Sequence, residues 1–119
     1  MARVTGLGGA FLRAADPKAL YAWYEQHLGV GSAEGSFSFS RETQRACIAV
    51  AFFPKSSEYF PVSQAAMLNF QVDDLDAVME KLKAAGVEVD PRREDYDYGR
   101  FGWFVDPEGN RVELWQPAE

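Results

Sequence analysis

The stretch Leu68-Asn69-Phe70-Gln71-Val72-Asp73-Asp74 decides the fold, because an alternating apolar run ends at an acidic residue that opens an amphipathic segment. The same pattern stands earlier in the chain, where Leu12 and Ala14 lead to Asp16, 58 positions before Asp74 (74 − 16). A chain of 119 residues is about two such units. One unit alone buries too little surface to be comfortably stable. The repeat therefore predicts two modules that share a core and leave a ligand cleft between their sheets.

Each half is expected to contain a strand, a helix and then two or three further strands. The first helix should be capped by Asp16 and should end at Gly29, and the second should be capped by Asp73 or Asp74 and should end at Gly86. A tight turn is predicted over 106–110, where proline and glycine take the positions of a hairpin turn. The strands are expected over 8–14, 36–39, 46–53, 67–72, 102–105 and 111–116, and 87–89 is expected as a short strand or an extended connection.

Composition and charge narrow the class of protein. The net charge of −6 comes without a concentrated basic face, which argues against a nucleic-acid partner. No apolar run approaches the roughly 20 residues of a membrane span, and the first residues have no apolar leader, so a cytoplasmic protein without a membrane partner is expected. The single cysteine, Cys47, suits a reducing compartment and is predicted to be a buried, inert thiol.

Alternation assigns two faces to each predicted strand. The helix-facing side is expected to carry the apolar residues Ala10, Leu12, Ala14, Leu68, Phe70, Val72, Val112 and Leu114. The opposite side mixes aromatic and polar residues, namely Phe11, Arg13, Met67, Asn69, Gln71, Arg111, Glu113 and Trp115. Aromatic walls with a few polar groups are typical of a small-molecule pocket, and a half-solvated sheet face is the alternative.

Three segments carry a family resemblance: Gly9-Ala10-Phe11-Leu12-Arg13-Ala14-Ala15-Asp16-Pro17 with Trp23-Tyr24-Glu25-Gln26-His27-Leu28-Gly29, then Leu68–Leu75, and Asp106–Leu114. They resemble the vicinal oxygen chelate superfamily, which includes glyoxalase I, bleomycin resistance proteins and extradiol dioxygenases. The resemblance implies an α+β fold of two βαβββ modules that form an incomplete curved-sheet barrel. It implies one domain over 1–119, with modules at about 5–60 and 65–117, and a homodimer.

The resemblance also implies where a metal would be held. Family members place a His or Gln on the first strand, a His on the first strand of the second module and a Glu on the last strand. Gly9, Met67 and Glu113 occupy these positions here, and the end of the first module offers no carboxylate over 49–51. A divalent metal needs about three protein ligands, and a thioether is a poor ligand for hard ions. Glu113 is the only family-type ligand retained, so we expect no catalytic metal and no cofactor.

Three roles are open to Glu113: an ion-pair partner of Arg13 or Arg111, a ligand-binding group, or a general base. Trp103, with Tyr96, Tyr98 and Arg100, either rims the pocket, forms a dimer edge or belongs to a solvated loop. The stretch 55–60 offers Tyr59 and Phe60 as a second rim. The only histidine, His27, is expected to pack near the end of the first helix.

The leading hypothesis is a glyoxalase/bleomycin resistance-like protein that binds a small, partly aromatic molecule in the cleft without a catalytic metal. The ligand-binding residues would be Phe11, Arg13, Met67, Asn69, Gln71, Trp103, Glu113 and Trp115. The alternative is a lyase-, isomerase- or dioxygenase-type enzyme that uses Glu113 as a base or metal ligand. A third hypothesis is a structural or regulatory dimer that binds no ligand, in which the chain's own Trp115 and Phe11 fill the pocket.

Overall fold

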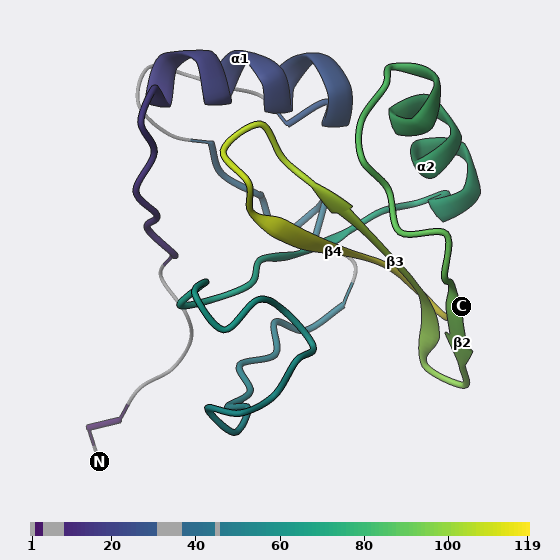
Figure 1. Cartoon of the computed structure of the whole chain (residues 1–119). Helices are drawn as coiled ribbons and strands as arrows, with labels where there is room; N and C mark the ends of the chain where they lie inside the picture. The colour runs from purple at the N-terminus through teal and green to yellow at the C-terminus, as the bar shows by residue number, and fades with distance from the viewer. Residues whose placement is uncertain (1, 4–8, 31–36, 45) are drawn as a thin grey trace.

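The computed structural model describes residues 2–3, 9–30, 37–44 and 46–119. Within them the chain forms two helices and four strands in the order α1, β1, α2, β2, β3, β4 (Figure 1). The elements are α1 Pro17–Leu28, β1 Asn69–Gln71, α2 Leu75–Ala84, β2 Glu94–Tyr96, β3 Gly99–Val105 and β4 Arg111–Pro117. Neither helix is long and apolar enough to cross a membrane.

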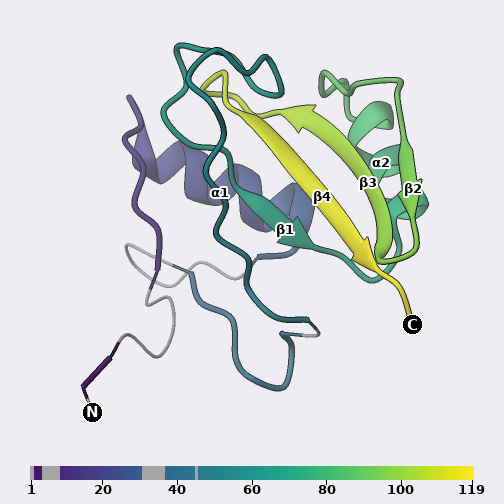
Figure 2. The same cartoon turned by 90° about the horizontal axis from the view of Figure 1, so that it is seen from below.

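The four strands form one sheet in the order β1-β4-β3-β2. β1 runs parallel to β4, and the pairs β3–β4 and β2–β3 are antiparallel. Both helices lie on one side of this sheet, as Figure 2 shows from the other side. The second half of the chain is thus a complete strand–helix–three-strand unit, and the α+β fold class is confirmed.

The helix ends follow the predicted caps. The Asp16 carboxylate accepts a hydrogen bond from the Ala19 amide at 3.1 Å, and Gly29 ends α1 with a φ of 66°, which glycine adopts without strain. The Asp74 carboxylate caps α2 in the same way, with the Ala77 amide at 3.1 Å. The 58-position offset therefore relates two helices that begin by the same physical device.

The core lies between α2 and the sheet. It contains fully buried apolar side chains from α2, β3 and β4, which are Leu75, Met79, Leu82, Phe104, Val112 and Leu114. Leu68, Phe70 and Val72 pack against this cluster, so the predicted helix-facing side of the second module is confirmed.

Two carboxylates attach α1 to the turn between β3 and β4. Asp106 is buried and accepts from the Tyr24 hydroxyl at 3.0 Å, while its other oxygen accepts from two amides of the turn. Glu108 accepts from the amides of Ala15 and Asp16 at 3.0 and 3.1 Å. Burial, and then the charge and hydrogen bond of Asp106, raises the pKa of the Tyr24 phenol. The first helix is therefore fixed to the second module by polar contacts as well as by packing.

The strands predicted for the first half are not formed. Residues 9–14, 37–39 and 46–53 make no ladder among the described residues, and residues 8 and 36 lie outside the described part of the chain. A strand needs a partner for its backbone groups, and these segments have no strand partner among residues 2–3, 9–30, 37–44 and 46–119. Phe11 and Phe52 are consequently 99% and 95% exposed. Cys47 is exposed in the same stretch, so the prediction of a buried thiol is wrong.

A further difference concerns the outer strand of the sheet. The outer strand is β2 at 94–96, in the stretch for which a solvated loop was one expectation. Of the predicted segment 87–89, Val89 makes only an isolated bridge to Phe104. The Asp97-Tyr98 turn lets β2 fold back on β3, because Gly99 follows it with a φ of 142°.

Removal of the Tyr24 hydroxyl should destabilise the protein. In Tyr24→Phe the buried Asp106 carboxylate loses one donor, and the free energy of unfolding at neutral pH should fall by about 2 kcal/mol. The folded protein holds the Tyr24 proton above the pKa of about 10 of an unfolded tyrosine. Wild-type stability should therefore decline as pH rises above about 10, and the difference between the two proteins should narrow there.

Chemical denaturation at neutral and alkaline pH measures this effect. Tyr96→Phe is the matched control, because its hydroxyl bonds the more exposed Glu94, and it should change stability by less than about 0.5 kcal/mol. Equal effects of the two substitutions would contradict the role given to Tyr24.

Candidate functional site

Register places two rows of side chains on the sheet face opposite the helices. In the first row, Asn69 pairs with Glu113 and Glu113 pairs with Trp103. In the second row, two residues further along β4, Trp115 lies between its neighbours Gln71 and Phe101, and Glu94 of β2 follows Phe101. The alternation of each strand therefore gathers polar and aromatic groups from all four strands on one face.

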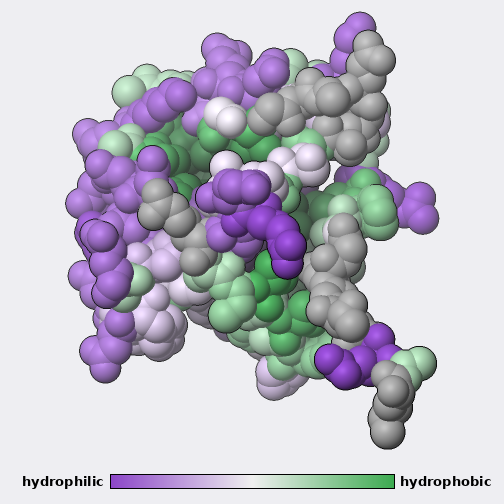
Figure 3. Space-filling view, turned by 180° about the vertical axis from the view of Figure 1, so that it is seen from behind, coloured by the Kyte–Doolittle hydropathy of each residue, from purple (hydrophilic) through white to green (hydrophobic). Residues whose placement is uncertain are grey.

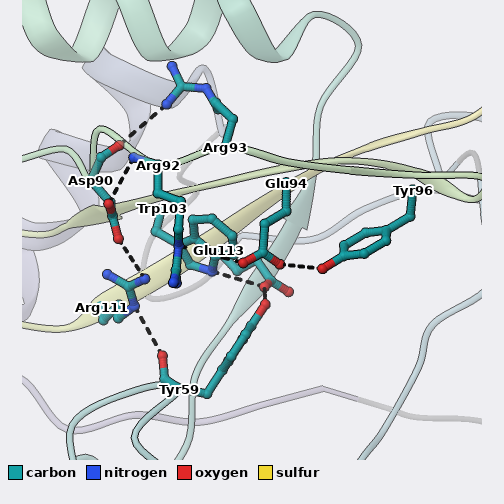
Figure 4. Close-up of polar contacts among 9 residues, drawn as sticks. All are labelled: Tyr59, Asp90, Arg92, Arg93, Glu94, Tyr96, Trp103, Arg111 and Glu113. Atoms are coloured by element: carbon teal, nitrogen blue, oxygen red, sulfur yellow. Dashed lines mark hydrogen bonds and ion pairs between the residues drawn. The ribbon is translucent and has the colours of Figure 1, made fainter.

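The Glu113 carboxylate is the centre of the first row. One oxygen accepts from the Asn69 amide nitrogen at 2.6 Å. The other accepts from the Trp103 indole at 3.0 Å and from the Tyr59 hydroxyl, as Figure 4 shows. Glu113 is only 7% exposed and Trp103 is fully buried. A carboxylate offers about four acceptor positions, so these three donors leave about one.

Tyr59 comes from the loop that follows Pro54 and covers the first row. Burial raises the pKa of its phenol, and the hydrogen bond to Glu113 and the charges of Glu113 and Glu94 raise it further. Tyr59 therefore keeps its proton and acts as a donor to Glu113 over the physiological range. Its ring also meets Trp103 edge to face, with centroids 6.0 Å apart.

Arg111 fastens this loop to β4. Its guanidinium donates to the Tyr59 carbonyl at 3.2 Å, and its backbone amide and carbonyl each bond the Gln64 side chain at 2.9 Å. The same guanidinium pairs with Asp90 at 3.0 Å and lies 5.3 Å from the centre of the Trp103 ring. Arg111 is thus committed to Asp90, and the ion pair with Glu113 that was one expectation is not the arrangement found.

The predicted site residues divide into three groups. Asn69, Trp103 and Glu113 are in contact, and Trp115 lies in the neighbouring row. The Gln71 side chain forms hydrogen bonds with the backbone amide and carbonyl of Ala46 at 3.0 and 3.1 Å. These bonds hold residue 46 beside β1. The remaining predicted residues lie outside these rows: Met67 is half-buried just before β1, and Phe11 and Arg13 are exposed on a segment that adds no strand to this face. His27 packs on Trp23 in α1, as expected.

The sequence predicted a different role for one group of this face, Tyr59, and did not predict another, Glu94. Tyr59 was expected only as an apolar rim, yet its hydroxyl bonds a residue 54 positions away. Glu94 was not singled out, although it shares the face with Phe101 through the β2–β3 ladder. The position of Glu94 could have been predicted from the sequence if 94–96 had been assigned to a strand, because alternation then places Glu94 and Tyr96 on the same face.

The residues at the family's metal-binding positions do not fit a divalent metal. Gly9 has no side-chain donor, and Met67 supplies only a thioether. The oxygens of Glu113 already accept three hydrogen bonds from protein groups. In the described part of the chain, no group of three or more His, Cys, Asp or Glu side chains could hold a metal ion.

The contact between Tyr59 and Glu113 predicts a titration change. Glu113→Gln removes the negative charge at residue 113 that helps to raise the pKa of Tyr59 and replaces one carboxylate oxygen by an amide group, but it leaves the burial of Tyr59, which is the largest cause. The phenol should then lose its proton at a lower pH than in the wild type, yet still above the ordinary pKa of about 10. Ultraviolet absorbance of tyrosinate measures this, with Tyr59→Phe as the reference that identifies the transition. An unchanged titration in Glu113→Gln would disprove the coupling.

Comparison with solved structures shows the same fold. The protein VPC_CASS1, from the mobile metagenome of V. Pseudocholerae, is 25% identical over all of this chain and 99% of its own, with a TM-score of 0.63. The integron cassette protein VCH_CASS1 of V. Cholerae is 22% identical over 99% of each chain, with a TM-score of 0.64. TnmS3, an antibiotic binding protein from Streptomyces sp. CB03234, is 23% identical over 88% of this chain and 89% of its own, with a TM-score of 0.56.

The family follows from a match over most of the chain. No curated protein matched the sequence significantly. A family model described as the Glyoxalase/Bleomycin resistance protein/Dioxygenase superfamily matches residues 6–114. This match and the fold together show that the chain belongs to the Glyoxalase/Bleomycin resistance protein/Dioxygenase superfamily.

Proposed function

We propose that this protein binds a small, partly aromatic molecule on the sheet face opposite the helices, without a catalytic metal. The observation that carries the proposal is the arrangement of a buried, hydrogen-bonded carboxylate beside a row of aromatic rings. Glu113 and Trp103 supply the polar anchor, and Phe101 and Trp115 supply apolar contact in the next row. Pockets that bind small molecules combine apolar walls with a few fixed polar groups in this way.

The geometry favours binding over base catalysis at Glu113. Its three donors come from Tyr59, Asn69 and Trp103, and one acceptor position is left for a ligand. If Glu113 took up a proton, it would have to give up part of this donor set. A ligand that donates one hydrogen bond needs no such rearrangement.

The second candidate is a lyase- or isomerase-type enzyme, or a dioxygenase-type enzyme, that uses Glu113 as a base or metal ligand. The contact of Glu113 with the Tyr59 hydroxyl favours it, because a phenol beside a carboxylate can relay a proton. The third candidate, a dimer that binds no ligand, is favoured by the way Tyr59 already covers Glu113.

Ligand screening and metal analysis separate these candidates. A library of small aromatic molecules should raise the melting temperature, and Trp115→Ala and Glu113→Gln should each raise the Kd of a hit about tenfold, which is about 1.4 kcal/mol. Metal bound below stoichiometry after purification with added Zn, Mn, Fe, Ni or Co would agree with the proposal. One tightly held metal per chain would overturn it and favour the enzyme, and no hit at all would favour the third candidate.

We also propose that the protein forms a homodimer, in which a second copy covers the first half of the chain. The accessible surface is 9027 Å², whereas a folded monomer of 13.3 kDa exposes about 6,500 Å². The excess of about 2,500 Å² per chain corresponds to about 5,000 Å² for two chains, which is at the upper end of the range that obligate dimers bury. Large apolar side chains make up part of it, and Figure 3 shows hydrophobic patches on one face. The exposed apolar residues of the first half are Phe11, Leu12, Phe39, Ile48, Val50, Phe52, Phe53 and Val62.

Two sequence observations support this partner and its compartment. The second module shows what its repeat in the first half should form, and the described residues of that repeat pair with no strand in the part of the single chain that the structure describes. Its exposed backbone groups and apolar side chains are both satisfied if a second copy supplies a sheet edge.

The single cysteine suits the cytoplasm, which we propose as the location.

Light scattering after size-exclusion chromatography tests the dimer. The wild type should elute at about twice 13.3 kDa, and Phe52→Asp should shift it towards the monomer mass by burying a charge in the interface. Phe52→Leu is the control, since it keeps an apolar side chain and should remain dimeric. A monomeric wild type at micromolar concentration, or a dimeric Phe52→Asp, would contradict this interface.

A further inference from the structure

Four aromatic rings form an aromatic corner, defined as Tyr96, Tyr98, Phe101 and Trp115, at the β2 end of the sheet face. Phe101 and Trp115 are stacked, with centroids 6.0 Å apart and an interplanar angle of 4°. Tyr96 and Tyr98 are also stacked, at 5.2 Å and 5°. Each tyrosine meets Phe101 edge to face, at 66° and 71°. The two stacked pairs therefore meet at a steep angle and leave two kinds of ring surface side by side.

The backbone holds this corner in place. A Cβ at Gly99 would collide with the Trp115 indole, and a φ of 142° also requires glycine there. The Trp115 indole donates to the Tyr98 carbonyl at 3.1 Å, so the ring is fixed against the β2–β3 turn. Tyr98 is nevertheless 59% exposed. The four rings are neighbours, and a contiguous exposed apolar patch marks an interaction site more than scattered apolar residues do.

A carboxylate lies next to the corner. Glu94 pairs with Phe101 across the ladder and accepts from the Tyr96 hydroxyl at 2.7 Å. Arg92 approaches Glu94 only at 3.5 Å, and its side chain is 57% exposed, so it screens Glu94 weakly. Arg92 and Arg111 lie 5.2 and 5.3 Å from the centre of the Trp103 ring, and Arg111 is bonded to Asp90. With Glu113 in the adjacent row and a net charge of −6, this face favours a positive ligand.

We infer that the ligand is a planar aromatic molecule with a positive charge, whose ring stacks in the aromatic corner and whose cation faces Glu94. Electron-rich tyrosine and tryptophan faces attract cations, and a nearby carboxylate adds to that attraction. This inference rests on the proposed function and names the chemical class of its ligand. A neutral ring could also stack on this surface, but it would gain nothing from the charge of Glu94, whose own partner Arg92 is a solvent-exposed side chain.

Two planar three-ring dyes of similar size test the inference. Proflavine carries a positive charge at neutral pH, and 2-aminoacridone is neutral there. Proflavine should bind at least tenfold tighter by fluorescence titration, and added salt should reduce that difference. Glu94→Gln should weaken proflavine to the affinity of 2-aminoacridone and leave the neutral dye unchanged. Glu80→Gln is the matched control, because it removes the same charge from α2 on the opposite side of the sheet.

Tyr98→Ala provides a second variant that is safe for folding, because its side chain is exposed. It should weaken both dyes at least fivefold while the melting temperature stays unchanged. Equal binding of the two dyes, or proflavine binding that ignores Glu94→Gln, would overturn the cationic class. If library molecules bind and depend on Trp115 but proflavine does not bind, this inference alone fails. If nothing binds, the proposed function fails with it. A change of oligomeric mass in Tyr98→Ala would assign the corner to the dimer interface and overturn the inference.

Discussion

A buried carboxylate sets the constraint on which the site depends. Removing the charge of Glu113 from water is costly unless hydrogen bonds replace its hydration. Three segments far apart in the chain supply those bonds: Asn69 from β1, Trp103 from β3 and Tyr59 from the covering loop. The loop in turn depends on Arg111, which precedes Glu113 by two residues on β4 and bonds the loop backbone and Gln64. The position of the loop and the hydrogen bonding of the Glu113 carboxylate are therefore linked, and a change in one should alter the other.

The two halves of the chain are physically unequal in spite of their shared pattern. In the second half β1 has β4 as a neighbour, and α2 covers the apolar side of the ladder. The first half has its helix, fixed to the β3–β4 turn through Asp106 and Glu108, but the described parts of its apolar segments form no ladder. Helices satisfy their own backbone, whereas strands need a neighbour. The same sequence pattern can thus produce a helix that satisfies its own backbone and leave the strand segments without a neighbouring sheet edge. The proposed dimer would supply that edge, and it would at the same time cover the exposed apolar residues of the first half.

Features that depend on local chemistry were predictable from the sequence. The Asp16 and Asp74 caps, the turn at 106–110 and the helix-facing side of β1 all follow from residues close together in the chain. Alternation also placed Asn69 and Glu113 on one face. Long-range choices were not predictable: Tyr59 reaches Glu113 only because Arg111 and Gln64 hold its loop, and Arg111 pairs with Asp90 because of the loop before β2. The strands of the first half failed as predictions because periodicity reports which residues could pair and carries no information on whether a partner is present.

The spacing of the two rows constrains any ligand that uses both. Glu113 and Trp115 are two residues apart on β4, which is about 7 Å along a strand. A molecule that stacks in the aromatic corner and donates to the last acceptor position of Glu113 must span about that distance. Tyr59 covers the Glu113 end, so a longer ligand would have to displace its hydroxyl, whereas a short one would contact Glu94 and the rings alone. If the proposed ligand binds here, the covering loop would limit its length at one end of the face, and ligand size as well as charge would decide which of the two carboxylates it contacts.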